Sequence, residues 1–205
     1  MRNTPLLILF GLFFSFEVNA GEPIANIGEL NYDFAKAHRA ALGLPRLYSL
    51  LVSHRGELVF EEYYNGTDLR RPANMKSASK SVISALVGIA IEKGYIESVD
   101  DPIIKYFPDY ISDQINSDKQ LITIENLLTM QSGLETTSNR NYGKWVLSEN
   151  WVEFAINQPL VAKPGTRMLY STGSTHILSA ILTRASGIDT KAFAQKHLAS
   201  KLGYS

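Results

Sequence analysis

Residues 77–80 read Ser-Ala-Ser-Lys, so Ser77 stands three positions before Lys80 at the start of a long apolar run. Residues three apart share one face of a helix, which brings a lysine within hydrogen-bond reach of a serine hydroxyl. Desolvation and the positive end of a helix dipole both favour the neutral amine, which can accept the serine proton. The Ser77 backbone N–H at the helix start points to where an oxyanion would form. The pair predicts a nucleophilic serine with its base.

The same pair has a simpler explanation. A serine at a helix start is usually an N-cap, and Lys80 would then lie on an exposed stripe of the helix. The chain has 19 serines and 11 lysines in 205 residues, so one Ser-x-x-Lys is expected by chance. The surroundings of the pair therefore have to decide between the two explanations.

Other catalytic designs have less support in the sequence. There is no Gly-x-Ser-x-Gly elbow, and no metal or cofactor is expected, because metal-ligand spacing is absent among His38, His54, His176 and His197. A Ser/His/Asp triad stays open, since triads are recognised by geometry that a sequence does not show.

Apolar periodicity predicts a hairpin followed by a mainly helical chain. Alternation over 47–53 and 57–64, with Gly56 between them, favours two antiparallel strands, and Asn65-Gly66 favours a turn. The run 77–93 is apolar on nearly every side, which predicts a buried helix. Further expected elements are helices over 27–41, 123–130, 148–158, 177–185 and 193–198, and a short strand over 167–170.

The first twenty residues are typical of a secretory signal. A positive Arg2 precedes an apolar stretch over 6–16, and Val18-Asn19-Ala20 offers small residues for cleavage. A membrane anchor is the alternative, but this stretch falls well short of the roughly 20 residues that span a bilayer. We expect a signal peptide over 1–20, a secreted or periplasmic protein without stable membrane insertion, and a mature N-terminus at Gly21, which intact-mass analysis would detect.

Composition narrows the possible partners. The chain is 45% hydrophobic, carries no formal net charge and contains no cysteine. A neutral chain has no excess positive charge with which to bind nucleic acid. Without disulfides, an exported chain depends on its hydrophobic core for stability. Composition therefore indicates no nucleic-acid partner, and the sequence predicts no particular oligomeric state.

Four segments resemble one family in order and spacing. They are residues 75–110, 122–134, 163–187 and 193–204, and they are similar to the serine β-lactamase and penicillin-binding-protein superfamily. The class C β-lactamase-related branch, which includes D-aminopeptidases, esterases and 6-aminohexanoate-dimer hydrolases, is most similar. The resemblance covers most of 47–205. It implies a serine hydrolase domain over 21–205 with an α/β (α+β) fold, an antiparallel sheet hairpin beside a mainly helical region.

The resemblance also implies roles for single residues. Ser77 would be the nucleophile of an acyl-enzyme, Lys80 its base or proton relay, and Tyr170 the group that passes a proton to the leaving group and helps to activate water. Thr172 stands where the class C pattern Tyr-x-Asn has an asparagine that binds the amide side chain of a β-lactam. A hydroxyl cannot replace both functions of an amide, so an ester or small amide is favoured as substrate.

One part of the family pattern does not occur in this sequence. The third motif, Lys or His followed by Thr or Ser and Gly, is absent after Tyr170. The domain is therefore expected to be C-terminally incomplete, and the 205-residue chain alone is expected to lack turnover. A non-catalytic or penicillin-binding cell-wall receptor of the same superfamily is the alternative. The substrate, whether ester, amide, β-lactam or D-amino-acid peptide, stays open.

Overall fold

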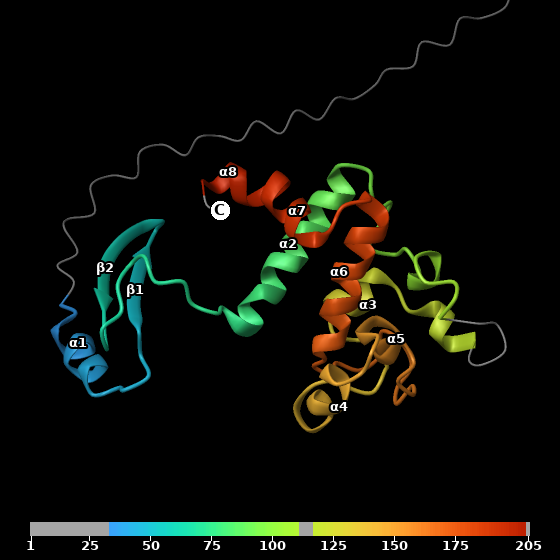
Figure 1. Cartoon of the computed structure of the whole chain (residues 1–205), viewed down its shortest axis with the longest axis horizontal. Coiled ribbons are helices and arrows are strands. Elements are labelled where there is room, and N and C mark those ends of the chain that lie inside the picture. Colours follow the sequence, from blue (N-terminus) through green and yellow to red (C-terminus); the bar gives the residue numbers. More distant parts are fainter. Residues whose placement is uncertain (1–32, 111–116, 204–205) are drawn as a thin grey trace, which may run out of the picture. The chain divides into compact units, whose positions relative to one another are not determined.

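A computed structural model describes residues 33–110 and 117–203 (Figure 1). The predicted signal peptide and the first part of the helix predicted from residue 27 lie outside these ranges. The chain divides into two compact units, Met1–Ala73 and Asn74–Ser205, and each is described by itself. Within the described ranges, no helix has both the length and the hydrophobicity to cross a membrane.

The first unit contains the predicted hairpin. Strands β1 (Ser49–His54) and β2 (Glu57–Tyr63) pair antiparallel, with an irregular register between Val52 and Ser53, and helix α1 (Ala35–Leu42) precedes them. Arg55 and Gly56 in the connecting turn both have positive φ angles, 53° and 87°. Two such residues match the right-handed twist of the strands, which explains the tight connection. The prediction of a hairpin is confirmed.

The second unit is helical. Its longest helices are α2 (Ser79–Glu92) and α6 (Thr172–Ser186). The shorter helices are α3 (Ile124–Leu128), α4 (Tyr142–Val146), α5 (Trp151–Ile156), α7 (Thr190–Ala194) and α8 (Ser200–Leu202), with a π turn η5 (Gln195–Ala199) between the last two. Single 3₁₀ turns are η1 (Lys76–Ala78), η2 (Ile103–Lys105), η3 (Ser117–Leu121) and η4 (Asn139–Asn141).

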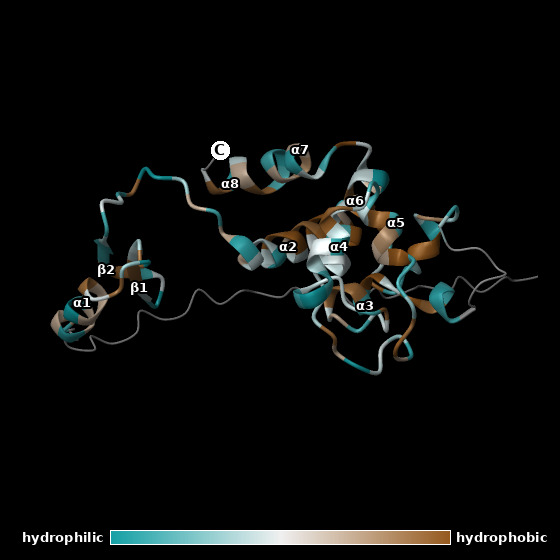
Figure 2. Cartoon of the chain, turned by 60° about the horizontal axis from the view of Figure 1, so that its bottom comes forward, coloured by the Kyte–Doolittle hydropathy of each residue, from teal (hydrophilic) through white to brown (hydrophobic). Residues whose placement is uncertain are grey.

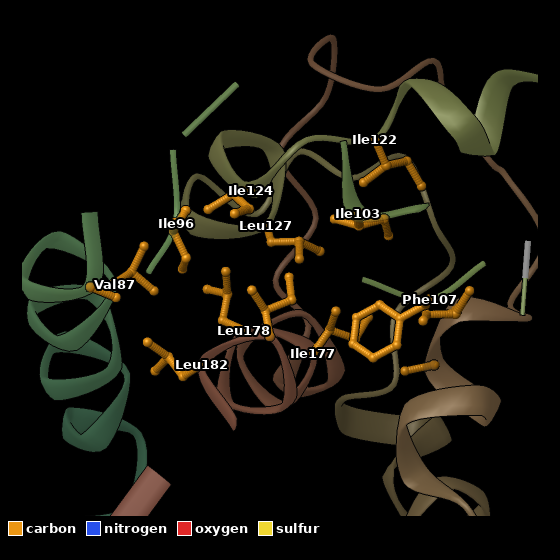
Figure 3. Packing of buried hydrophobic residues seen from close by; sticks show 14 of the residues in the cluster. Val87, Ile96, Ile103, Phe107, Ile122, Ile124, Leu127, Ile177, Leu178 and Leu182 are labelled. Carbon is orange, nitrogen blue, oxygen red and sulfur yellow. The ribbon is translucent and has the colours of Figure 1, made fainter. Parts of the chain in front are cut away.

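Helix α6 lies at the centre of this unit and packs against α2, α3 and α5. Its buried side chains include Ile177, Leu178, Ile181 and Leu182, at the spacing of one helix face. Figure 3 shows Leu178 and Leu182 in one cluster with Val87 of α2, and Figure 2 shows apolar residues along both helices. The two long helices therefore share one core, and they bring residues almost a hundred positions apart to the same place.

Two predictions about elements are wrong. Residues 167–170 form no strand: the two described strands pair with each other, and Leu169 donates a single backbone bond, to Met130 at 2.8 Å. Helix α2 is not buried nearly all round. It buries Leu86, Val87 and Ala90 on one face, while Ser84 and Gly88 are exposed on the other.

Candidate active site

Ser77 lies in the 3₁₀ turn η1, two residues before α2 begins. Neither η1 nor α2 has a side-chain cap, so the explanation of Ser77 as an N-cap is wrong. Its side chain is exposed, and its Oγ accepts a hydrogen bond of 2.8 Å from the phenol of Tyr170. The serine that could have closed a helix end is bonded instead to a tyrosine 93 positions further along the chain.

The backbone just before Ser77 has an unusual conformation. Lys76 has a φ of 52°, in the left-handed region that costs a residue with a side chain about 1–3 kcal/mol. Two side chains hold it there: Asn74 Oδ1 accepts from the Lys76 N–H at 2.8 Å, and Ser79 Oγ donates to the Lys76 carbonyl at 2.7 Å. Such strain is typical of functional sites, and this turn leaves the Ser77 side chain exposed at the start of α2.

Lys80 contacts Tyr170 rather than Ser77. Its half-buried side chain places Nζ 5.3 Å from the centre of the Tyr170 ring. In the described ranges, the hydrogen-bond partner of the Ser77 hydroxyl is Tyr170, which donates to it. The expected direct Ser77–Lys80 bond is therefore not present. Ser77 precedes the first α-helical residue, and so the i, i+3 geometry of a helix does not apply to the pair.

The environment of Tyr170 favours its phenolate. The hydrogen bond with Ser77 has the largest effect and lowers the pKa of Tyr170. Desolvation opposes it, and the hydrogen bond and positive charge of Lys80 lower the pKa further by smaller amounts. Tyr170 is also 38% exposed, so a substrate can reach it. The ring that contacts both Ser77 and Lys80 is thus the best-placed proton acceptor for the serine.

If Tyr170 accepts the proton of Ser77, the rate at which a fluorophosphonate probe labels Ser77 should rise with pH as Tyr170 loses its proton. The midpoint should lie below 10, the ordinary tyrosine pKa, since the pKa of Tyr170 is lowered. Lys80→Gln should move the midpoint upward, because it removes the charge that stabilises the phenolate. Rates measured between pH 6 and 10.5 test this. A midpoint that Lys80→Gln leaves in place would contradict it.

Three consecutive hydroxyl residues position Tyr170 and the start of α6. Thr136 Oγ1 donates to the Tyr170 carbonyl at 2.6 Å. Ser138 Oγ accepts from the Thr172 N–H at 2.8 Å and lies 2.9 Å from the Thr172 hydroxyl. Sequence reasoning placed Thr172 at a substrate-binding position, and the structure engages its hydroxyl with Ser138. Thr136 and Ser138 therefore fix the backbone from the Tyr170 carbonyl to the Thr172 N–H, directly after the Tyr170 side chain.

Thr137, the middle residue of the three, makes the remaining links and is 1% exposed. Its N–H donates to Ser171 Oγ at 3.2 Å, and its own Oγ1 accepts from the Gly173 N–H at 2.7 Å. Sequence reasoning missed this hydroxyl cluster, residues 136–138. The run Thr-Thr-Ser was visible, but nothing in a sequence indicates that it bonds to residues 34 to 36 positions away.

A pocket of about 240 Å³ opens beside Lys80, between α2 and α6. Helix α2 contributes Ser79, Lys80 and Ile83, α6 contributes Thr172, Thr175, His176 and Ser179, and α4 contributes Trp145. His176 packs edge-on against Trp145 and Trp151, with ring centres 5.7 and 5.4 Å apart. Burial lowers the pKa of His176 below the ordinary histidine value. Sequence reasoning did not connect this histidine with Lys80.

The hairpin and the helical unit match the corresponding parts of β-lactamase/transpeptidase-like proteins of known structure. The family model for Beta-lactamase matches residues 38–205. The chain therefore belongs to the Beta-lactamase family. No curated protein matched the sequence.

Solved structures show the same fold. A candidate β-lactamase from Bacteroides dorei is 22% identical, with a TM-score of 0.68 over 84% of this chain and 52% of its own. A candidate 6-aminohexanoate-dimer hydrolase from Bacillus anthracis is 20% identical, with a TM-score of 0.65 over 78% of this chain and 45% of its own. EstCE1, a hydrolase with promiscuous acyltransferase activity, is 19% identical, with a TM-score of 0.65 over 82% and 50%. The chain spans about half the length of these proteins.

Proposed function

We propose that this protein is an exported serine hydrolase that cleaves an ester or small amide through an acyl-enzyme on Ser77. The observation that carries the proposal is the 2.8 Å hydrogen bond between Tyr170 and Ser77, beside the ammonium group of Lys80. Labelling of Ser77 by a fluorophosphonate tests it directly, because the probe measures attack by the serine without requiring a complete catalytic cycle.

The first step is attack by the serine. The Tyr170 phenolate accepts the proton of Ser77, and the Ser77 oxygen forms a bond to the substrate carbonyl carbon. The negative charge moves to the carbonyl oxygen, near the Ser77 backbone N–H, which donates no hydrogen bond within the described ranges. The positive charge of Lys80 stabilises the phenolate form of Tyr170.

The second half of the cycle returns the proton. Tyr170 donates it to the departing alcohol or amine as the bond between carbonyl carbon and leaving group breaks, which leaves Ser77 acylated. Tyr170 then accepts a proton from water as the water oxygen bonds to the acyl carbon. The bond between the acyl carbon and Ser77 Oγ breaks, Tyr170 returns the proton to Ser77, and the acid product leaves with the phenolate restored. We propose that the second oxyanion donor and the third motif of the family lie in a part of the protein beyond these 205 residues. Labelling without release of product would instead favour the cell-wall receptor.

We expect p-nitrophenyl butanoate to acylate Ser77 faster than nitrocefin does. The Thr172 hydroxyl lies within hydrogen-bond distance of the Ser138 hydroxyl. Unlike asparagine, threonine has no amide group that could bind the amide side chain of a β-lactam. Mass spectrometry of the intact protein after mixing gives both rates, and Thr172→Asn should narrow the difference. A nitrocefin rate above that of the ester would show that Thr172 does not disfavour β-lactams.

Export is part of the proposal and rests on the first twenty residues. Arg2, the apolar stretch over 6–16 and the small residues before Gly21 support cleavage after Ala20. The protein would then act in the periplasm or outside the cell. Recovery of secreted protein that retains Met1 would count against this part alone and leave the chemistry of Ser77 untouched.

A further inference from the structure

The first turn of helix α6 is capped by residues from another part of the chain. Ser171, the N-cap residue, makes no side-chain hydrogen bond to the helix, and its Oγ accepts from the Thr137 N–H at 3.2 Å. Ser138 Oγ accepts from the Thr172 N–H at 2.8 Å. Thr137 Oγ1 accepts from the Gly173 N–H at 2.7 Å. The hydroxyl cluster therefore satisfies the first two N–H groups of α6 in place of an ordinary N-cap.

Thr136 joins this cap to Tyr170. Its Oγ1 donates to the Tyr170 carbonyl at 2.6 Å and accepts from the Ser138 N–H at 2.9 Å. Thr136 is 8% exposed, and the loss of a buried hydrogen bond leaves its partner groups unsatisfied, which costs more than the loss of an exposed one. A single hydroxyl thus links the residue that carries the phenol to the residue that caps α6.

The backbone of Thr136 is fixed as well. Asn141 Nδ2 donates to the Thr136 carbonyl at 2.9 Å, and the Thr136 N–H donates to Glu135 Oε1 at 2.8 Å. Both backbone groups and the hydroxyl of Thr136 therefore have hydrogen-bond partners. A side chain whose own backbone is fixed in this way can hold a neighbouring segment in one position.

The contacts of the Tyr170 phenol depend on the position of this segment. The phenol donates to Ser77 Oγ at 2.8 Å, and Lys80 Nζ lies 5.3 Å from the centre of the ring. Ser77 and Lys80 belong to η1 and α2, whereas Tyr170 directly precedes α6. Hydrogen bonds weaken steeply when they are stretched or misaligned, so a small shift at the start of α6 weakens the contact between phenol and serine.

We propose that Thr136 is a positioning residue for Tyr170: its hydroxyl holds the start of α6 so that the phenol stays on Ser77, and it acts on the serine only through that phenol. The inference rests on the function proposed above, in which Tyr170 accepts the proton of Ser77. A residue that only stabilises α6 changes the amount of folded protein. A positioning residue changes the reactivity of the protein that is folded.

Thr136→Val keeps the shape of the side chain and removes the hydroxyl. In the full chain it should slow fluorophosphonate labelling of Ser77 about fivefold or more. It should also move the midpoint of the pH profile of labelling upward, because the contacts that lower the pKa of Tyr170 become weaker. Thr136→Ser, which keeps a hydroxyl, should restore both the rate and the midpoint. An unmoved midpoint in Thr136→Val would overturn the proposal.

Ser186→Ala is the matched control. It removes a hydroxyl that donates to a backbone carbonyl at 2.6 Å at the other end of α6, and it should leave the rate and the midpoint unchanged. Equal effects of Ser186→Ala and Thr136→Val would show that any loss of stability in α6 slows the serine, and would overturn the proposal. Asn141→Ala loosens Thr136 without removing its hydroxyl and should move the midpoint upward by less. It decides the question in the same way if Thr136→Val does not fold.

A double-mutant cycle tests whether Thr136 acts through the phenol of Tyr170. Tyr170→Phe removes the phenolic oxygen and keeps the backbone carbonyl to which Thr136 donates. In that background Thr136→Val should cause no further loss of labelling rate, because the contact that Thr136 positions is already gone. The same loss in both backgrounds would identify a general structural effect and contradict the inference.

Ultraviolet titration of the tyrosines separates this inference from the proposed function. The difference between each protein and its Tyr170→Phe counterpart gives the titration of Tyr170 without requiring a reactive serine. A midpoint that Thr136→Val raises, in a protein whose Ser77 never labels, would contradict the hydrolase and leave the positioning role standing. Normal labelling of Ser77, with a Tyr170 midpoint that Thr136→Val leaves in place, would contradict the positioning role and leave the hydrolase standing.

Discussion

Tyr170→Phe should slow fluorophosphonate labelling of Ser77 by about 10²- to 10⁴-fold, the usual contribution of a positioned proton acceptor. The substitution removes only the phenolic oxygen, which lies 2.8 Å from Ser77 Oγ. The ring and its contact with Lys80 remain in place. Ser77→Ala should abolish labelling at the site. Gel fluorescence followed over time, with the labelled peptide identified by mass spectrometry, measures both effects.

Tyr142→Phe provides a matched control. Tyr142 is an exposed tyrosine of α4, and its ring contacts Trp145 without a hydrogen bond from its hydroxyl within the described ranges. Loss of the Tyr142 hydroxyl should leave the labelling rate of Ser77 unchanged. Labelling that persists in Ser77→Ala would identify another serine as the nucleophile. A Tyr170→Phe variant that reacts as fast as the unaltered protein would move the role of base to Lys80.

Gly173→Ala should destabilise the helical unit by about 1–3 kcal/mol, because a Cβ here has no room. It would lie 2.6 Å from Thr137 Oγ1 and 2.9 Å from the Ala155 Cβ. Thr137 Oγ1 also accepts the Gly173 N–H, so a shift of Thr137 breaks that bond as well. Because Tyr170 lies three residues before Gly173, labelling of Ser77 should slow in the same variant.

The same substitution at Gly88 should have the opposite effect. Gly88 lies inside α2, on its exposed face, and a Cβ there would meet nothing within 4 Å. Alanine is a better helix former than glycine, so Gly88→Ala should stabilise by about 0.5–1 kcal/mol. Urea unfolding followed by tryptophan fluorescence reports on this unit, which contains both tryptophans. A Gly173→Ala variant as stable as Gly88→Ala would contradict this prediction, because it would show that Thr137 and Ala155 move aside without loss of stability.

The sequence by itself determined the elements whose signals are local. Alternation over 47–64 with a glycine in the turn specified the hairpin, and the 3.6-residue spacing of Ile177, Leu178 and Ile181 specified the core face of α6. Order and spacing of four segments also indicated the family, because each segment keeps its own motif. The hairpin and the core face of α6 depend on residues within one or two turns of each other, where side-chain periodicity and turn chemistry dominate.

The start of α2 shows where local signals fail. Serine and lysine three residues apart predicted one helix face, yet Lys76 adopts a left-handed conformation and α2 begins only at Ser79. Asn74 and Ser79 hold this turn by side-chain hydrogen bonds, which compete with helical ones. A periodicity argument does not include that competition, so the local spacing placed Lys80, rather than Tyr170, against the serine.

The resemblance grouped Ser77, Lys80 and Tyr170, but only the tertiary structure decided which of these groups contact each other. Ser77 and Tyr170 come together because α2 and α6 share a core, and residues 136–138 hold the backbone at 170–173 through hydroxyl groups. The unpaired hydroxyl of Thr175 likewise exists only because packing buries it. Contacts between residues 34 to 93 positions apart arise from the sum of many apolar contacts across the core, and no short window of sequence contains that sum.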